Sequence, residues 1–248
     1  MKHRTHLMLA LLATAAATLP ATSLAASASE QIAEAVAHPA RPAADRARDA
    51  DRKPAEAIAL TGMHAGAKVA EIMPGGGYFT RIFSRVVGPT GVIYAWVPAP
   101  TGGRDMGAAL RTMAADANYS NIKVADLDPA RPLPEKVDLV WTSLNYHDMR
   151  GRPNADLTPH NKMVFDALKP GGLYMVIDHA AEKGATNGGT LHRVDAELVK
   201  QDMTSVGFKL VQESDLLRNP ADDRTKSSGN SGRGKSDQFV LLFQKPAG

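Results

Sequence analysis

Cysteine is absent from all 248 residues of the chain. This absence excludes disulfides, thiolate nucleophiles, cysteine-ligated metals and a lipid anchor attached to cysteine. Aromatic residues make up only 5% of the sequence. Acidic and basic residues are mixed along the chain, with a net charge of +3 and no cluster of lysine and arginine. We therefore expect neither aromatic surfaces that stack on bases nor basic surfaces that bind a phosphate backbone, and we predict no nucleic-acid partner. Apolar residues still make up 44%, enough for a sizeable core.

Long apolar runs are also rare, and the one that occurs lies at the N-terminus. Lys2 and Arg4 precede residues 7–19, which are all apolar or small, and Ala26-Ser27-Ala28 fits a signal-peptidase site. The run is shorter than the roughly 20 residues that a membrane-spanning helix needs. We therefore predict a signal peptide over residues 1–28, and a mature protein that is periplasmic or secreted without stable membrane insertion.

The rest of the chain divides into two parts. Residues 29–60 predict a helical extension, broken by prolines, whose charges form a solvated face. Residues 61–248 alternate strand and helix patterns, but no helix separates the last two strands. This predicts an α/β domain with a Rossmann-like, mostly parallel seven-strand sheet and an antiparallel last strand. We expect strands at 68–72, 92–97, 121–125, 137–144, 173–177, 208–213 and 238–244, helices at 77–87, 155–168 and 190–206, and a turn at 169–172.

A glycine-rich turn follows the first expected strand. Glu71 ends that strand, and Pro74, Gly75, Gly76 and Gly77 lead into the next helix. Glycines let the backbone approach a ligand closely, and the helix N-terminus offers unpaired N–H groups. The pattern lacks the G-x-G-x-x-G spacing and the acid on the next strand that a dinucleotide site needs.

The segment instead resembles the first motif of the class I S-adenosylmethionine-dependent methyltransferases. Glu71, Gly75 and Gly77 match that motif, and residues 145–148, 169–172, 178–179, 192–195 and 218–223 are similar to a bacterial group of exported methyltransferases. The resemblance covers residues 40–246 and implies the seven-strand methyltransferase fold, with S-adenosylmethionine as cofactor. The cofactor-binding residues that it implies are Glu71, Pro74, Gly75, Gly76, Gly77, Tyr78, Asp126 and Asn145.

Two positions depart from this family pattern. Met73 stands where the first glycine of the motif belongs, so a side chain crowds the space for the methionine part of the cofactor. The second strand ends at Val97, where the family usually has an acid for the ribose hydroxyls. Losing such a charge-assisted acceptor should weaken cofactor binding by roughly a few kcal/mol.

Polar residues follow the fourth and fifth strands and open the next helix. Because parallel strands end at one edge of the sheet, we expect these residues to surround one pocket. Histidine exchanges protons near neutral pH, so the set suits general acid–base catalysis, with His147 as the first choice for the base and His179 as the second. The predicted catalytic residues are His147, Asp148, His179 and His192.

The sequence leaves alternatives open. Asp148, Asp178, His179 and His192 also suit zinc, iron or manganese, but no tight ligand motif such as H-E-x-x-H occurs, so no metal is assigned. Residues 218–223 form either a lid or a tie between the last hairpin and the sheet. The favoured hypothesis is methyl transfer to a small molecule. The alternatives are an exported binding protein with the methyltransferase shape and a metal-dependent enzyme. Neither the acceptor nor an oligomeric state can be deduced from the sequence.

Overall fold

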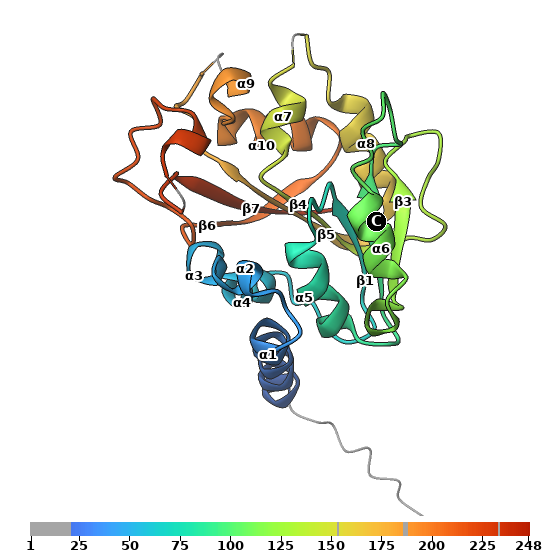
Figure 1. Cartoon of the computed structure of the whole chain (residues 1–248). Coiled ribbons are helices and arrows are strands. Elements are labelled where there is room, and N and C mark those ends of the chain that lie inside the picture. Colours follow the sequence, from blue (N-terminus) through green and yellow to red (C-terminus); the bar gives the residue numbers. More distant parts are fainter. Residues whose placement is uncertain (1–20, 153, 186–187, 233) are drawn as a thin grey trace, which may run out of the picture.

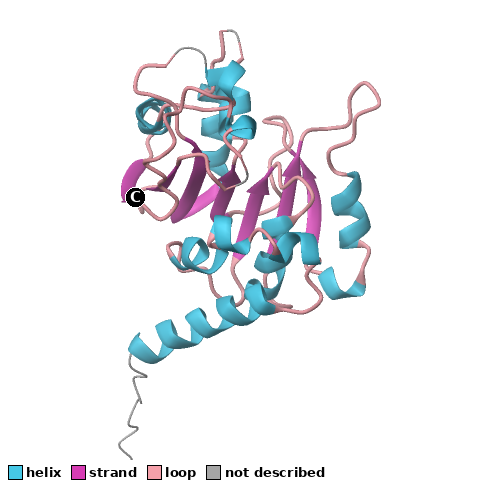
Figure 2. Ribbon diagram, turned by 60° about the vertical axis from the view of Figure 1, so that its left-hand side comes forward, coloured by secondary structure: helices cyan, strands magenta, loops and turns pink. Residues whose placement is uncertain are grey.

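A computed structural model describes residues 21–152, 154–185, 188–232 and 234–248 (Figure 1). Its centre is one seven-stranded sheet of order β3-β2-β1-β4-β5-β7-β6, in which β7 runs antiparallel to both its neighbours (Figure 2). The predicted fold class is therefore confirmed. The strands are β1 Lys68–Ile72, β2 Val92–Val97, β3 Ile122–Asp126, β4 Val137–Ser143, β5 Leu168–His179, β6 Lys209–Ser214 and β7 Gln238–Gln244.

Helices cover both faces of the sheet, and each face has its own apolar core. One core contains Val69 and Trp141 from the strands, and the other contains Ala70 and Val140 from the same strands. Strands buried on both faces read as continuous apolar runs, which is why β1, β2 and β4 stand out in the sequence. The first face carries α1 Ala21–Ala37, α4 Pro54–Ala59, α5 Tyr78–Val87 and α6 Ala108–Ala114; the second carries α7 Tyr146–Arg150, α8 Thr158–Ala167 and α10 Ala196–Ser205.

Within the described residues, the N-terminal segment contains four helices. Between α1 and α4 lie two one-turn helices, α2 Ala43–Arg46 and α3 Asp49–Arg52, and Pro54 occupies the first turn of α4. Helix α1 runs through the predicted cleavage point at residue 28, while residues 1–20 of the predicted signal peptide lie outside the described residues. Every helix in the described part of the chain is too short or too polar to reach across a bilayer.

Some predicted boundaries were wrong. The expected turn at residues 169–172 belongs to β5, where the pairing with β4 shifts register between Val137 and Leu139. The expected helix from residue 190 begins only at Ala196, because His192 takes a left-handed backbone and Asp195 caps the helix by accepting a hydrogen bond from Glu197 N–H. Short elements not foreseen are α6, α7, α9 Gly188–Leu191 and the 3₁₀ turns Ala117–Tyr119 and Ser228–Asn230.

Candidate active site

In the turn between β1 and α5, every second residue from Met73 to Gly77 has a left-handed backbone conformation. Met73, Gly75 and Gly77 have φ angles of +47°, +60° and +82°. The left-handed backbone favours glycine at position 77, and a Cβ there would also stand 2.5 Å from the Cε atom of Met113 and displace that side chain. Met73 carries a side chain in a conformation that costs about 1 kcal/mol or more outside glycine. Met73 thus has a backbone conformation that suits glycine, the residue that the sequence resemblance places at this position.

A cavity of about 340 Å³ lies in front of this turn, at the carboxyl ends of β1 and β4. Ligands bind at this edge in open α/β sheets. Six of the eight predicted cofactor residues line it: Glu71, Pro74, Gly75, Gly76, Tyr78 and Asn145. Gly77 shapes the turn without lining the cavity, and Asp126 at the end of β3 pairs with Arg131 outside it.

Glu71 places a buried carboxyl group in the cavity wall. The residue is 3% exposed, and its Oε2 atom accepts a hydrogen bond of 2.5 Å from the hydroxyl of Thr80. Burial raises the pKa of Glu71 to about 7, although the Thr80 hydrogen bond and the charges of Arg52 and Arg81 act in the opposite direction. Near neutral pH this group therefore ionises readily when a cation approaches.

Asn145 joins the end of β4 to the glycine turn. Its side-chain amide donates to the carbonyl oxygen of Ile72 at 3.0 Å and to that of Met73 at 3.4 Å, while its Oδ1 atom accepts from the hydroxyl of Thr142. The preceding residue, Leu144, is also left-handed, with φ of +60°. Asn145 thus sets the shape of the cavity as well as lining it.

The N-terminal helices close the cavity from the other side. Asp45, Arg48 and Arg52 line it together with the turn residues. The guanidinium groups of Arg48 and Arg52 lie 5.3 and 4.6 Å from the centre of the Tyr78 ring. The expectation that the charges of residues 29–60 form only a solvated face was therefore wrong for these three. The four-residue spacing of Arg48 and Arg52 was the available signal, since it suits one face of a helix.

A buried ion pair fixes these helices in place. Arg41 has a fully buried side chain and pairs with Asp49 at 2.7 Å, and the Tyr78 hydroxyl donates to the same carboxylate at 2.6 Å. Arg81 pairs with Asp45 at 2.9 Å and also donates to the carbonyl oxygen of Gly76 at 2.9 Å. Helices α2 and α3 are thereby tied to the glycine turn.

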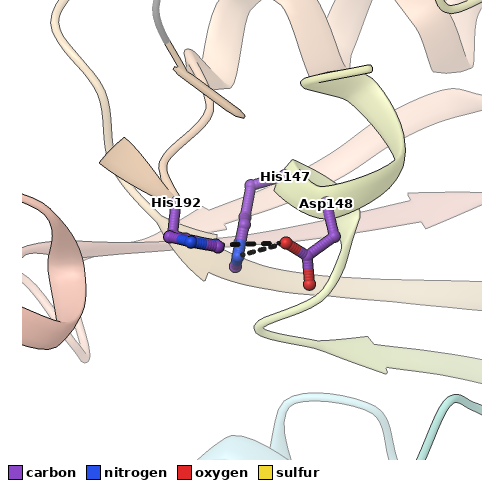
Figure 3. A group of neighbouring side chains, drawn as sticks. All are labelled: His147, Asp148 and His192. Carbon is purple, nitrogen blue, oxygen red and sulfur yellow. Dashed lines mark hydrogen bonds and ion pairs between the residues drawn. The ribbon is translucent and has the colours of Figure 1, made fainter. Parts of the chain in front are cut away.

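The polar residues that were expected to surround one pocket, His147, Asp148, Asp178, His179 and His192, form a polar rim in which only some of them meet. His147 donates its backbone N–H to Asp178 at 2.9 Å, and its Nδ1 atom lies 2.6 Å from the same fully buried carboxylate. Asp148 Oδ1 lies 3.4 Å from His147 Nε2 and 3.2 Å from His192 Nδ1 (Figure 3). Burial alone would lower the pKa of His147, but Asp178 and Asp148 outweigh it and raise the pKa above the usual 6.5.

His179 belongs to the same edge but turns elsewhere. Its ring centre is 5.7 Å from that of His147, and its Nδ1 atom is 2.8 Å from the hydroxyl of Ser236. Burial lowers the pKa of His179 to about 4, so this imidazole is neutral at physiological pH. It lines a second cavity, of about 350 Å³, which shares Arg48, Arg52 and Leu144 with the first. The two cavities are therefore neighbours.

Residues 218–223 tie the last hairpin to the sheet. Arg218 donates to Asp237 at 2.9 Å, and Asp237 N–H donates to Asp222 at 2.6 Å. Arg193, fully buried, pairs with Asp222 at 2.8 Å. Of the two alternatives, the structure thus supports the tie.

Comparison with solved structures gives the architecture a precedent. An S-adenosylmethionine-dependent methyltransferase from Aquifex aeolicus matches with a TM-score of 0.56 and 15% identity, over 76% of this chain and 87% of that one. The fold is that of the class I methyltransferases. The glycopeptide N-methyltransferase MtfA, solved with sinefungin, matches with a TM-score of 0.55 and 16% identity over 80% of this chain and 86% of its own.

The same methyltransferase fold also occurs with another activity. The [4+2]-cyclase SpnF matches with a TM-score of 0.56 and 17% identity, over 80% of this chain and 82% of its own. Neither a family model nor a curated protein matches the sequence. At these identities the likeness establishes the fold, and the reaction has to be argued from the site.

Proposed function

We propose that this protein transfers a methyl group from S-adenosylmethionine to a small-molecule acceptor. The observation that carries the proposal is the cavity between the glycine turn and the end of β4, with the buried Glu71 in its wall. Its position in the sheet is where this fold binds ligands, and the likeness to solved S-adenosylmethionine-dependent methyltransferases supports the same use.

The cavity residues fit the charges of this cofactor. S-adenosylmethionine carries an ammonium, a carboxylate and a sulfonium, and when bound it supplies an electrophilic methyl group. The Glu71 carboxylate would hold the cationic part, and Arg48 and Arg52 would hold the carboxylate. Gly75 and Gly76 leave open space, since a Cβ on either would meet no atom within 4 Å.

The reaction also needs a base and an orienting frame. Asp178 holds Nδ1 of His147, so Nε2, which lies 3.4 Å from Asp148, is the nitrogen that would accept the proton that the acceptor loses. His179 is the second candidate, because Ser236 occupies its Nδ1 atom and burial keeps it neutral. Fixing acceptor and donor in line supplies most of the remaining rate enhancement.

Weak cofactor binding is part of the proposal. Val97 is buried at the end of β2 and offers no carboxylate for ribose, and Asp126 is paired with Arg131. The missing acceptor lowers affinity by about 2 kcal/mol, or roughly thirtyfold.

We further propose export and placement in the group of exported methyltransferases that the sequence resembles. Among the α1 side chains that the structure describes, residues 28–37, the buried ones are Ile32 and Ala35, and removing residues 1–28 leaves their packing in place. Cell fractionation with N-terminal sequencing of the mature chain tests this. A cytoplasmic protein that still begins at Met1 would refute it.

Calorimetric titration with S-adenosylmethionine and S-adenosylhomocysteine tests the function. Gly75→Val introduces a branched side chain into the cavity at a φ of +60° and should abolish binding. Gly62→Val is the matched control, because its φ is +64°, its surroundings are equally open and it lies outside the cavity. If the wild-type protein binds neither nucleoside, or Gly62→Val loses binding as fully as Gly75→Val, the proposed site is wrong.

A further inference from the structure

Three potential metal ligands from two separate segments meet at the rim. His147 and Asp148 come from α7, and His192 follows α9; one ligand atom from each lies within 4.8 Å of the other two (Figure 3). Asp148 Oδ1 is 3.4 Å from His147 Nε2 and 3.2 Å from His192 Nδ1. Ligands about 2.1 Å from a metal at tetrahedral angles lie about 3.4 Å apart. The two separations therefore suit a shared ion.

The first of these ligands is already oriented for a metal. Asp178 is fully buried and takes Nδ1 of His147 at 2.6 Å, which presents Nε2 to Asp148 and His192. Metal-binding histidines commonly use their second nitrogen in this way, because the carboxylate fixes the ring and makes it a better ligand. The backbone N–H groups of His147 and His179 also bind Asp178, so this support is rigid.

The third ligand is brought to the site by close backbone packing. A Cβ on Gly189 would stand 2.4 Å from the carbonyl oxygen of Gly151, and a Cβ on Gly151 would stand 2.4 Å from Cα of Gly189. Only glycine at both positions lets α7 and α9 touch. His192 then adopts a φ of +49°, which a non-glycine residue takes up at a cost of about 1–3 kcal/mol. The fold thus accepts strain where His192 approaches α7.

We propose that His147, Asp148 and His192 bind one divalent transition metal. Two imidazoles and one carboxylate suit zinc or ferrous iron, with remaining positions left for water or substrate. The side chains of Asp148 and His192 are each 55% exposed, so an ion can enter and the open positions face solvent. The ligand role and the proposed base role use the same Nε2 atom of His147, so they exclude each other in one molecule.

Titration of the full-length, untagged protein with Zn²⁺ after chelator treatment tests the site, and Co²⁺ serves as a visible-absorption probe. We expect one Zn²⁺ per chain. His192→Ala and Asp148→Asn change exposed side chains and should weaken binding at least about tenfold. Asp178→Asn should weaken it about 10- to 100-fold through the orientation of His147. His64→Ala, at an exposed histidine outside the rim, should leave binding unchanged.

Two outcomes would overturn the site: no stoichiometric binding, or Zn²⁺ affinity that His192→Ala and Asp148→Asn leave unchanged. Replacing His3 and His6 by Gln should retain binding, and loss of binding there would place the metal at the N-terminus instead. S-adenosylhomocysteine titration of the same variants keeps the two proposals apart. Its binding should persist in His192→Ala, whatever happens to the metal.

Discussion

At the scale of single residues, Met73 is the clearest departure from the methyltransferase pattern. It lines the cavity beside the glycine turn in a left-handed conformation that suits glycine. We expect Met73→Gly to strengthen S-adenosylmethionine binding about fivefold, equivalent to about 1 kcal/mol, because the cavity widens. The unfolding free energy should change little, since relief of strain offsets the lost packing of a half-buried side chain. Calorimetry and urea unfolding measure the two effects.

Met73→Ala distinguishes the effect of cavity space on binding from the effect of backbone strain on stability. It also widens the cavity but keeps the positive φ, so it should improve binding while being less stable than Met73→Gly by about 1 kcal/mol. Unchanged affinity in both variants would mean that the Met73 side chain does not occupy cofactor space.

Glu71 predicts a pH dependence of stability. Its pKa in the folded protein is about 7, above its ordinary value of 4.5, so the fold favours the protonated form. The stability that it contributes is fully present below pH 4.5 and is lost as the pH rises through 7, a change on the order of 3 kcal/mol. Glu71→Gln stays neutral and should be more stable than the wild-type protein at pH 8, with little difference at pH 5.

Urea unfolding at the two pH values measures this effect, with Glu56→Gln, an exposed carboxylate, as control. The same Glu71→Gln variant should bind S-adenosylmethionine more weakly, because the cationic part loses its partner. A variant that is less stable than the wild-type protein at pH 8 would show that Glu71 is ionised and paired in the fold.

At the scale of elements, the sequence pattern predicted those strands whose bounds depend on nearby residues alone. The bounds of β1, β2 and β7 agree with the predicted ranges, because each is a buried apolar run between turn residues. Helix α7 has only five residues, too few for a periodic pattern. Its importance comes from its neighbour in space, since α9 packs on it through Gly151 and Gly189, which lie far apart in the chain. Such contacts leave no trace in local periodicity.

In the candidate site, too, residues in a local motif were predicted, whereas residues placed by tertiary contacts were not. The glycine turn and Asn145 were recognised from motif and strand ends, but Arg48 and Arg52 were assigned to solvent. Their place in the cavity depends on how α2 and α3 return to the sheet through Arg41 and Asp49, a tertiary arrangement. Asp126 was expected to bind the cofactor, a prediction that stays untested, and its pairing with Arg131 depends on a neighbouring loop.

Arg193 is the buried centre of the contacts that tie residues 218–223 and the last hairpin to the sheet. Replacing it should therefore lower the unfolding free energy strongly. The Arg193 guanidinium pairs with Asp222 and also donates to Ala180 O at 3.0 Å, Lys226 O at 2.8 Å and Ser231 Oγ at 2.8 Å. Arg193→Met leaves the buried Asp222 without this partner and should lower the unfolding free energy by about 3–5 kcal/mol. Urea denaturation measures it.

Arg152→Met supplies the baseline, because Arg152 is exposed and its loss should cost less than about 0.5 kcal/mol. Arg193→Lys keeps the charge but cannot reach all four acceptors, so it should fall between the two. Equal stability of Arg193→Met and Arg152→Met would contradict a structural role for the tie.

At the scale of the whole molecule, the N-terminal extension behaves as part of the domain. Ile32, Ala35, Ala57 and Ile58 are buried in the core beneath one face of the sheet, and Asp45, Arg48 and Arg52 at α2 and α3 line the cavity beside the glycine turn. Burying two isoleucines is worth about 3–6 kcal/mol, a large part of the roughly 5–15 kcal/mol that stabilises a typical domain. A chain of residues 61–248 should therefore be barely stable and should lose cofactor binding.

A chain of residues 29–248 keeps all four of those residues and should match the full-length protein in both properties. Thermal unfolding and S-adenosylhomocysteine titration of the two truncated chains beside the full-length protein distinguish the possibilities. If residues 61–248 keep full stability, the extension is a separate cover rather than part of the core. If residues 29–248 are themselves strongly destabilised, the beginning of α1 contributes to folding, and removal of residues 1–28 as a signal peptide becomes physically implausible.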